Sequence, residues 1–420
     1  MNLTKINIKN FRCFEDLSID FHPQMNVFVG VNGSGKTALL DAIGVGLKAC
    51  LEVFGRGIFR AFLDDEDTRI LSVETGNVVD RCIQLPTSLE FFGNINNQPT
   101  EWTLYRGESE YGTTGSNIAN LIMDMESNTL LSHDSVQLPI ARYIPIKNKY
   151  SPDVSMISTR LQGYVGCLHF NSTQNAMIEW FKQMTFQGLQ EEKEIQELTA
   201  VTNAMKKCIE GIMKDVTDIR VRYGVKYKEL EILYTDKNGK KQRQPFRELS
   251  DGYRKTLSLV ADIAYRMAVL NPQLLDKVIE ETSGIVLIDE IDLHLHPSWQ
   301  QRILGDLMAI FPKVQFIVTT HAPSVISSVY EENLFLLKDG KCLGTGFEVF
   351  GRDVNTVLQT VMGVSERPDE VQAKFDKFYD AMDNEEFDTA EKILNDLRDM
   401  LGNGDPEITS ASVSLSLERM

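Results

Sequence analysis

Three short motifs, far apart in the chain, most constrain what this sequence can fold into. They read GVNGSGKT at Gly30 to Thr37, LSDGY at Leu249 to Tyr253 and GIVLIDE at Gly284 to Glu290. The first matches the phosphate-binding loop pattern, which needs an apolar strand before it and a helix after it. An apolar run at Asn26 to Val29 and a helical stretch from Thr37 to about Leu51 supply that context. The motif therefore predicts a mostly parallel sheet flanked by helices, with a phosphate site at its edge.

The phosphate loop indicates which atoms would hold a nucleotide. Backbone N–H groups over Gly33 to Thr37 and the first turn of the following helix would wrap the phosphates. Lys36 would reach the β and γ phosphates, and the Thr37 hydroxyl would bind Mg²⁺. The cofactors expected are therefore ATP and Mg²⁺. The candidate binding residues of this loop are Gly30, Asn32, Gly33, Ser34, Gly35, Lys36, Thr37 and Ala38.

Two further apolar runs end in residues that suit phosphate chemistry. In GIVLIDE the apolar strand delivers Asp289, which is expected to hold Mg²⁺, and Glu290, which is placed to polarise the attacking water. A second apolar strand at Val314 to Thr319 leads to His321, where an imidazole can hydrogen-bond a γ-phosphate. The candidate catalytic residues are therefore Glu290, Lys36 and His321, and Thr37 and Asp289 are the candidate metal ligands.

The LSDGY motif begins a helix at Ser250. A serine hydroxyl and the free N–H groups of a helix start together make an anion site. Serine and aspartate cap many helices, so the motif gains its specificity from lying just upstream of the acidic strand. His294 and His296 form an H-x-H pair that also suggests a metal, but the sequence offers no third ligand at suitable spacing. We favour the interpretation that this pair lies in a loop at the contact between two copies of the chain.

Together these residues resemble the ABC-type ATPase heads of the RecF, Rad50 and SMC group. The resemblance implies a head-to-head dimer in which Ser250 and Gly252 of one copy contact the ATP held by the other copy's phosphate loop. It also implies that Asp292 lies in a loop at the seam and that His321 is the switch histidine.

The same resemblance suggests two further nucleotide contacts. NFRCF, at Asn10 to Phe14, is similar to the opening of that group, and it implies that Arg12 lies near the nucleotide. Gln162, in RLQGY, is a candidate for the family's Mg²⁺-contacting glutamine, although the sequence does not fix that position.

A narrower resemblance covers nearly the whole chain. The region Gly163 to Pro245 is too short for the long coiled coil of SMC or Rad50 proteins. The LHLHP run, FGRDVNTVL at Phe350 to Leu358 and the ending LGNGDPEI are similar to prokaryotic anti-phage defence ATPases of Septu and retron systems, with PARIS and OLD-type ATPases as relatives. This resemblance implies a separate nuclease effector of the HNH type as partner, because the sequence after His321 lacks a strand-borne acidic cluster.

Periodicity divides the chain into an α/β ATPase head and a helical end. The expected parts are an N-terminal lobe with the phosphate loop and a β-rich subdomain at 1–160, a helical and β insertion at 161–245, a C-terminal ATPase lobe at 246–350, a helical hairpin at 351–405 and a flexible tail at 406–420. The polar stretch 112–134 is weakly patterned, and we interpret it as a mobile insertion.

Composition limits the partners. The net charge of −17 argues against a dedicated duplex-DNA binder, although the stretch Lys237 to Arg254 is locally basic and keeps nucleic-acid binding open. The six cysteines include no C-x-x-C pair, which is typical of reduced thiols in the cytoplasm. Apolar runs are only a few residues long, so we expect no membrane span.

Two other functions stay open from the sequence. A RecF-like DNA-repair ATPase would close a clamp around duplex DNA when it binds ATP. A nucleotide-bound scaffold would use ATP to join its subunits, with little turnover. Gene neighbourhood and the hydrolysis rate separate these readings from the defence subunit.

Overall fold

The computed structural model describes residues 1–51, 63–75, 78–108, 110–114, 137–145, 160–168, 173–213, 216–226, 228–343, 348–363 and 367–419. Most of the stretch 112–134 lies outside them. The chain divides into two compact units, residues 1–352 and 353–420. Within the described residues no helix is both long and apolar enough to cross a membrane.

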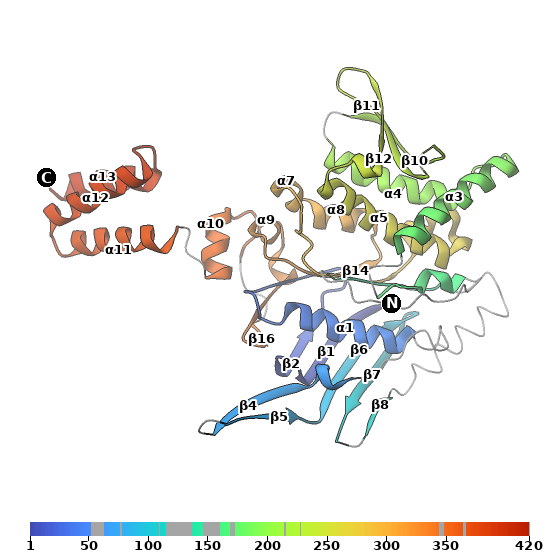
Figure 1. Ribbon diagram of the computed structural model, residues 1–420, viewed down its shortest axis with the longest axis horizontal. Helices are drawn as coiled ribbons and strands as arrows, with labels where there is room; N and C mark the ends of the chain where they lie inside the picture. Colours follow the sequence, from blue (N-terminus) through green and yellow to red (C-terminus); the bar gives the residue numbers. More distant parts are fainter. Residues whose placement is uncertain are drawn as a thin grey trace. The chain divides into compact units, whose positions relative to one another are not determined.

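The first unit is built around a six-stranded sheet in the order β16-β15-β3-β14-β13-β9 (Figure 1). Its strands are β3 (Met25–Val29), β9 (Ile140–Ile144), β13 (Gly284–Ile288), β14 (Val314–Thr319), β15 (Leu334–Lys338) and β16 (Lys341–Cys342). All neighbours are parallel except β16, which turns back antiparallel to β15. Every residue of β3, β13 and β14 is buried, as expected of strands covered on both faces. Their carboxyl ends meet at one edge, where ligands bind in open α/β sheets.

A second sheet, antiparallel, forms the β-rich part of the N-terminal lobe in the order β2-β1-β6-β7-β8. Its strands are β1 (Asn2–Phe11), β2 (Phe14–Asp20), β6 (Thr87–Ile95), β7 (Gln98–Arg106) and β8 (Tyr111–Thr114), and β4 (Arg69–Thr75) pairs with β5 (Val78–Gln84) beside it. Strand β2 is not among the elements expected from the sequence. Its Phe14, Leu17 and Ile19 are buried on one face, and it pairs with β1.

Helix α1 (Lys36–Leu51) lies between the two sheets (Figure 1). Its small residues allow this close packing. A Cβ on Gly46 would lie 2.2 Å from the Phe91 ring, and the Trp102 indole donates to the Gly46 carbonyl at 3.1 Å. On the other side, Gly44 faces the Tyr143 ring of β9. The helix that follows the phosphate loop is therefore fixed by both sheets.

The other helices of this unit belong to the insertion and to the C-terminal lobe. They are α3 (Thr173–Glu191), α4 (Gln196–Ile212), α5 (Asp251–Leu270), α6 (Val278–Glu281), α7 (Pro297–Gln300), α8 (Ile303–Ile310) and α9 (Pro323–Ile326). The short 3-10 turns of the whole unit are η1 (Asp65–Asp67), η2 (Arg160–Tyr164), η3 (Phe246–Glu248), η4 (Pro272–Lys277) and η5 (Glu331–Asn333). The helical segment from Pro297 to Ile310 is not continuous. It divides after Gln300, where the Arg302 N–H bonds the Trp299 carbonyl three residues back and tightens the turn.

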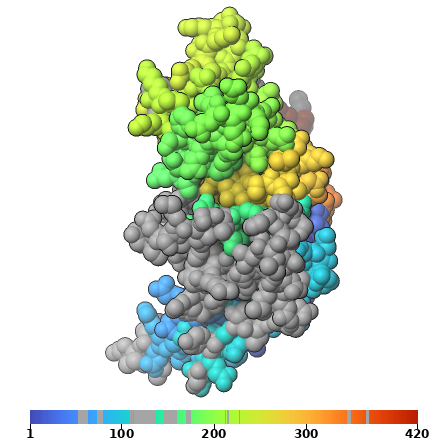
Figure 2. Space-filling view, turned by 90° about the vertical axis from the view of Figure 1, so that its right-hand side faces the viewer, coloured from blue at the N-terminus to red at the C-terminus, as the bar shows by residue number. Residues whose placement is uncertain are grey.

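A three-stranded antiparallel sheet extends the insertion. It consists of β10 (Thr217–Gly224), β11 (Glu229–Thr235) and β12 (Lys241–Pro245). Figure 2 shows this sheet, in yellow-green, beside the green surface of the insertion helices. The predicted strands and the DKNG turn at Asp236 to Gly239 are therefore present, and the turn joins β11 to β12.

The second unit is helical and has its own core. It contains α10 (Val354–Val357), η6 (Leu358–Met362), α11 (Asp369–Asp383), α12 (Phe387–Leu401) and α13 (Pro406–Glu418). Its core joins Phe375, Phe378, Leu394 and Leu397 of the predicted hairpin to residues of α13.

The tail expected at 406–420 is therefore largely a helix. Asp405 caps its first turn, Pro406 occupies the first helical position, and Ile408, Ala411 and Leu415 are buried at helical spacing. The sequence signal is weak because these three buried side chains are separated mainly by serines and other polar residues.

Candidate functional site

The phosphate loop leads from β3 into α1 with a backbone that only glycine fits. At Gly30 a Cβ would lie 2.3 Å from the Leu337 carbonyl oxygen. Gly35 has φ +102°, and a Cβ there would lie 2.7 Å from the Phe14 ring. The Lys36 ammonium lies inside the loop and donates to the carbonyls of Gly30 at 2.8 Å and Val31 at 3.0 Å. The loop is thus already folded around its lysine.

The remaining residues of the loop differ in exposure. Asn32, Gly33 and Thr37 are exposed, Ala38 is half-buried and Ser34 is buried. The exposed members leave the outer wall of the loop open to a ligand, while the Ser34 N–H closes the inner turn on the Val31 carbonyl at 3.1 Å.

The acidic strand meets this loop directly. The Thr37 hydroxyl donates to one oxygen of Asp289 at 3.0 Å, across the edge shared by β3, β14 and β13. Hydroxyl and carboxylate oxygens are the ligands that Mg²⁺ prefers, so this pair fits a magnesium ion beside the phosphates. Glu290 follows with φ +50°, a left-handed conformation that is uncommon outside glycine.

His321 lies two residues beyond β14 and is half-buried at the same edge. Its backbone N–H bonds Asp292 at 3.4 Å, and the Thr320 hydroxyl donates to the same carboxylate oxygen at 2.6 Å. The structure therefore brings together the phosphate loop, both acids of the strand, Asp292 and the histidine, as the sequence order suggested.

Burial and charge shift the titration of these groups. Burial lowers the pKa of Lys36, although Asp289 and Glu290 act in the opposite direction. Burial also raises the pKa of Asp289, and it raises that of Glu290 together with repulsion from Asp289. For His321, burial and then the nearby Lys36 charge lower the pKa, which favours a neutral imidazole. Three acids around one lysine make a site whose charge balance improves when a divalent cation binds.

The LSDGY motif forms the start of α5, as predicted. Ser250 is the N-cap residue, it is exposed, and its side chain makes no capping hydrogen bond within the helix. Gly252 packs so closely on the histidine-containing loop that a Cβ would lie 2.7 Å from the His294 carbonyl oxygen. Tyr253 stacks edge-on against Trp299 at 4.4 Å between ring centroids. The LSDGY motif, called the signature from here on, therefore packs against the loop that follows the acidic strand, and α5 is the signature helix.

His296 has a structural contact of its own. Its ring nitrogen Nδ1 lies 2.9 Å from the Ser298 hydroxyl and caps α7. This contact explains one member of the H-x-H pair without a metal.

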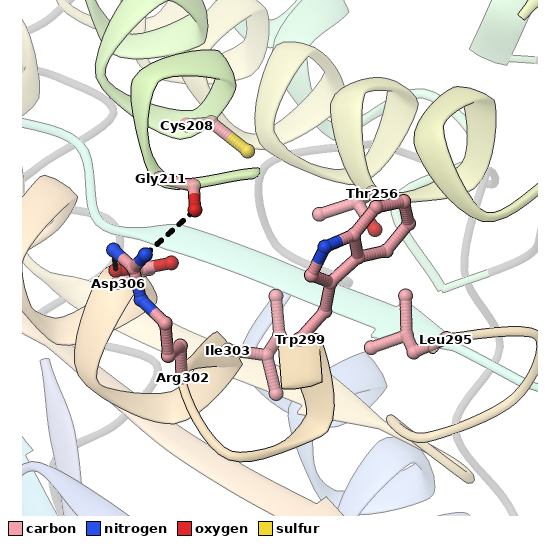
Figure 3. Close-up of a pocket in the computed structure, with 8 residues that line it drawn as sticks. All are labelled: Cys208, Gly211, Thr256, Leu295, Trp299, Arg302, Ile303 and Asp306. Atoms are coloured by element: carbon pink, nitrogen blue, oxygen red, sulfur yellow. Dashed lines mark hydrogen bonds and ion pairs between the residues drawn. The ribbon is translucent and has the colours of Figure 1, made fainter. Parts of the chain in front are cut away.

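A small pocket lies behind the signature helix, where α4, α5, α7 and α8 meet (Figure 3). Its walls include Thr256 of α5 and Trp299 of α7, and the Arg302 guanidinium bonds the Gly211 carbonyl at 2.7 Å across one end. The insertion helices therefore support the signature helix from behind.

Arg12 and Gln162 are the two nucleotide contacts implied by family resemblance, and the structure shows which parts of the protein surround them. The Arg12 guanidinium forms ion pairs with Asp41 at 2.5 Å and Asp67 at 2.9 Å. Gln162 lies in η2 and is exposed, and η2 packs against α5 and β9. Their roles at the nucleotide stay predictions.

Sequence reasoning missed a buried charge cluster behind the site. Arg142 of β9 pairs with Asp262 of α5 at 2.6 Å, and Asp262 also pairs with Arg266 at 3.2 Å. All three are at most 7% exposed. The arginines also donate to carbonyls of the segment 163–167, so they join this segment to the signature helix. An arginine inside the apolar run IARYI was the available signal.

Comparisons with known proteins give several similar families, relatives and structures. A family described as AAA domain matches residues 5–214, and one described as AAA domain, putative AbiEii toxin, Type IV TA system, matches residues 113–327. The chain is 26% identical to the Retron Ec83 probable ATPase of Escherichia coli over 88% of this chain and 78% of that protein. It is 24% identical to the Septu protein PtuA of Bacillus thuringiensis over 87% and 85%, respectively. A solved SMC head bound to the C-winged helix domain of ScpA is similar with a TM-score of 0.47 and 16% identity, over 83% of this chain and 98% of that one.

Proposed function

This chain belongs to the AAA-domain family, whose two descriptions each match about half of it, and from that membership we propose that it is the ATPase subunit of a prokaryotic anti-phage defence complex. It binds ATP with Mg²⁺, pairs head to head with a second copy and hydrolyses the ATP held between them. The relatives named as retron and Septu proteins support the defence setting.

One observation carries the ATPase proposal, the contact between Thr37 and Asp289 at the carboxyl edge of the sheet. It supports one cation position between the phosphate loop and the acidic strand. Mg²⁺, when bound there, neutralises charge on the phosphates. Lys36 would leave its loop carbonyls for the β and γ phosphates, and Glu290 would accept the proton of the attacking water. A neutral His321 can donate one hydrogen bond to the γ-phosphate.

The pairing of two heads rests on the exposed signature and on apolar side chains around the site. Ser250 leaves the N-terminus of a 20-residue helix free to bind an anion. Val31 of the phosphate loop is 50% exposed, and Leu293 of the loop after the acidic strand is 39% exposed. A second head that covers this face would bury both side chains and bring its Ser250 and Gly252 to the nucleotide.

ATP hydrolysis and particle mass test the proposal together. Glu290→Gln is expected to slow hydrolysis and to retain ATP-bound dimers, measured by phosphate release and by light scattering after size exclusion. Ser250→Arg is expected to prevent pairing while monomers still bind ATP, and Ser416→Arg, an exposed serine of α13, controls for the added charge. If Glu290→Gln hydrolyses ATP as fast as the parent, the assignment of the base is wrong. A parent that binds ATP but barely hydrolyses it would instead support a scaffold with little turnover.

The effector is proposed to be a separate nuclease of the HNH type, by resemblance to Septu systems. Co-purification of the product of the neighbouring gene tests it. A complete operon that lacks any nuclease or toxin gene would contradict it.

A RecF-like clamp on duplex DNA is the second candidate, favoured by the basic strand β12. Its arginine is already engaged, however. Arg243 pairs with the buried Glu231 at 2.6 Å, and Arg222 of β10 pairs with the same carboxylate at 2.7 Å. Exposed lysines of the hairpin remain for phosphate contacts. ATP-dependent duplex binding that weakens steeply with salt would favour this candidate over the first.

A further inference from the structure

Two threonines before the switch histidine tie β14 to the turn that carries the acids. The Thr319 hydroxyl donates to Asp289 at 2.6 Å and accepts from the Glu290 N–H at 2.8 Å. The Thr320 hydroxyl donates to Asp292 at 2.6 Å and accepts from the Ala322 N–H at 3.0 Å. Each hydroxyl therefore joins one carboxylate to one backbone N–H group.

The contacts between residues 319–321 and residues 289–292 follow one another in order along both segments. Besides the hydroxyl bonds, the Ile291 N–H donates to the Thr319 carbonyl at 3.0 Å, and the His321 N–H donates to Asp292 at 3.4 Å. The segment 319–321 therefore holds the segment 289–292 at successive positions. Both threonines are 0% exposed, so water does not replace these bonds when one is lost.

The bond to Glu290 has a particular consequence. Glu290 has φ +50°, a strained conformation for a non-glycine residue that persists only where surrounding contacts fix it. The Thr319 hydroxyl fixes the N–H of this residue, and the same hydroxyl orients Asp289, the candidate Mg²⁺ ligand. One buried oxygen thus holds the Asp289 carboxylate and the backbone of Glu290.

We propose that Thr319 and Thr320 are positioning residues that join the switch histidine to the acids, so that the backbone at His321 and the turn of Glu290 move as one body. This inference rests on the ATPase function proposed above. A γ-phosphate bound by His321 fixes Glu290 through this connection, and loss of the phosphate after hydrolysis releases both together.

Steady-state kinetics test the connection with three substitutions. Thr319→Val keeps the side-chain shape but removes the hydroxyl, and it is expected to lower kcat about 10- to 100-fold, the usual effect of removing a partner that orients a ligand. The KM for ATP is expected to change less than threefold, because Lys36 and the loop N–H groups are untouched. Thr319→Ser restores the hydroxyl and is expected to recover most of kcat. Thr282→Val is the matched control, since Thr282 is also 0% exposed and its hydroxyl accepts a hydrogen bond from Asn271.

A double-mutant cycle tests the link to the histidine. If Thr320 acts through His321 and Asp292, the effects of Thr320→Val and His321→Ala on kcat are not additive. Additive effects, or a Thr319→Val variant with the kcat of Thr282→Val, would overturn the proposal.

Hydrogen exchange gives a readout that does not need turnover. In Thr319→Val the amides of 290–291 are expected to exchange faster than in the parent and in Thr282→Val, while those of α1 are unchanged. A parent that hydrolyses no ATP contradicts the proposed function, and the exchange result then decides the connection by itself. Equal exchange in all three proteins would refute it.

Discussion

Removing the carboxylate of Asp262 tests how the signature helix is held. Asp262 accepts from two guanidinium groups, Arg142 at 2.6 Å and Arg266 at 3.2 Å, and both arginines are 1% exposed. Breaking a buried ion pair by removing one partner costs about 3–5 kcal/mol, because the remaining charge stays desolvated. The carbonyls of Gly166 and Val165 keep part of each guanidinium bonded, so we expect the lower half of that range for Asp262→Ala.

The assay follows directly from the tryptophan positions. All three tryptophans lie in the unit 1–352, and Trp180 contacts Tyr265 of α5 edge-on at 5.5 Å between ring centroids. Thermal unfolding followed by tryptophan fluorescence therefore reports this unit alone. At about 2–4 °C per kcal/mol for a large domain, a loss of about 3–4 kcal/mol corresponds to a decrease in Tm of roughly 6–16 °C.

Asp306→Ala is the matched control. It removes an aspartate that pairs with an arginine one helical turn away, Arg302 at 3.4 Å, but whose partner side chain is 48% exposed. Such pairs contribute at most about 1 kcal/mol. A Tm for Asp262→Ala within about 2 °C of the control would refute the reasoning.

The pH dependence gives a second check on the same variant. Burial alone would raise the pKa of Asp262, but the charges of Arg142 and Arg266 outweigh it and lower that pKa. A carboxyl with a lowered folded pKa stabilises the protein above its unfolded value, near 3.9, and loses that effect as the pH falls through the folded pKa. The Tm difference between parent and Asp262→Ala should therefore be full at neutral pH and shrink below about pH 4.

Three further outcomes follow from the site and from the second unit. Lys36→Ala is expected to abolish ATP binding in equilibrium dialysis, because the phosphates lose their cation; binding at parental affinity would contradict the loop assignment. The acid limb of kcat is expected above the ordinary glutamate value near 4.3, since burial and then Asp289 raise the pKa of Glu290, and Glu290→Gln should remove this limb from the pH profile. Phe378→Ala is expected to destabilise the second unit by about 3–5 kcal/mol, seen as faster hydrogen exchange in α11 and α12, with the tryptophan-reported Tm unchanged. A matching decrease in that Tm would mean that the two units unfold together.

The strands and loops that carry the nucleotide motifs were predictable because their residue types have few alternatives. Only an apolar run suits a strand such as β13, which is buried on both faces, and only glycine suits Gly35 at φ +102° against the Phe14 ring. The strand β2 was missed since its seven residues alternate only briefly between two loops. The helix α13 was missed because only three buried side chains, Ile408, Ala411 and Leu415, mark its inner face among serines.

The charged and hydroxyl networks were beyond the sequence for a different reason. Asp262 and Arg266 are one helical turn apart, which on an exposed helix indicates a solvated pair. Their partner Arg142 lies more than a hundred positions away in the chain, and only the register of β9 against β13 brings it to the same face. Thr319 similarly meets Asp289 across two parallel strands. Residue type predicts which groups can ionise or donate, whereas strand order decides which of them meet.

Arg12 illustrates that distinction at the site itself. Family resemblance implies a contact with the nucleotide, yet its guanidinium pairs with Asp41 at 2.5 Å and Asp67 at 2.9 Å. Asp41 lies one helical turn beyond Thr37, and its other oxygen accepts from the Tyr143 hydroxyl at 2.8 Å. A phosphate contact by Arg12 would break these bonds and leave the Asp41 carboxylate with the Tyr143 hydroxyl but without its guanidinium partner, one turn from a polyanion. The geometry therefore favours Arg12 as the residue that neutralises Asp41, so that the positive N-terminus of α1 faces the phosphates without an opposing charge.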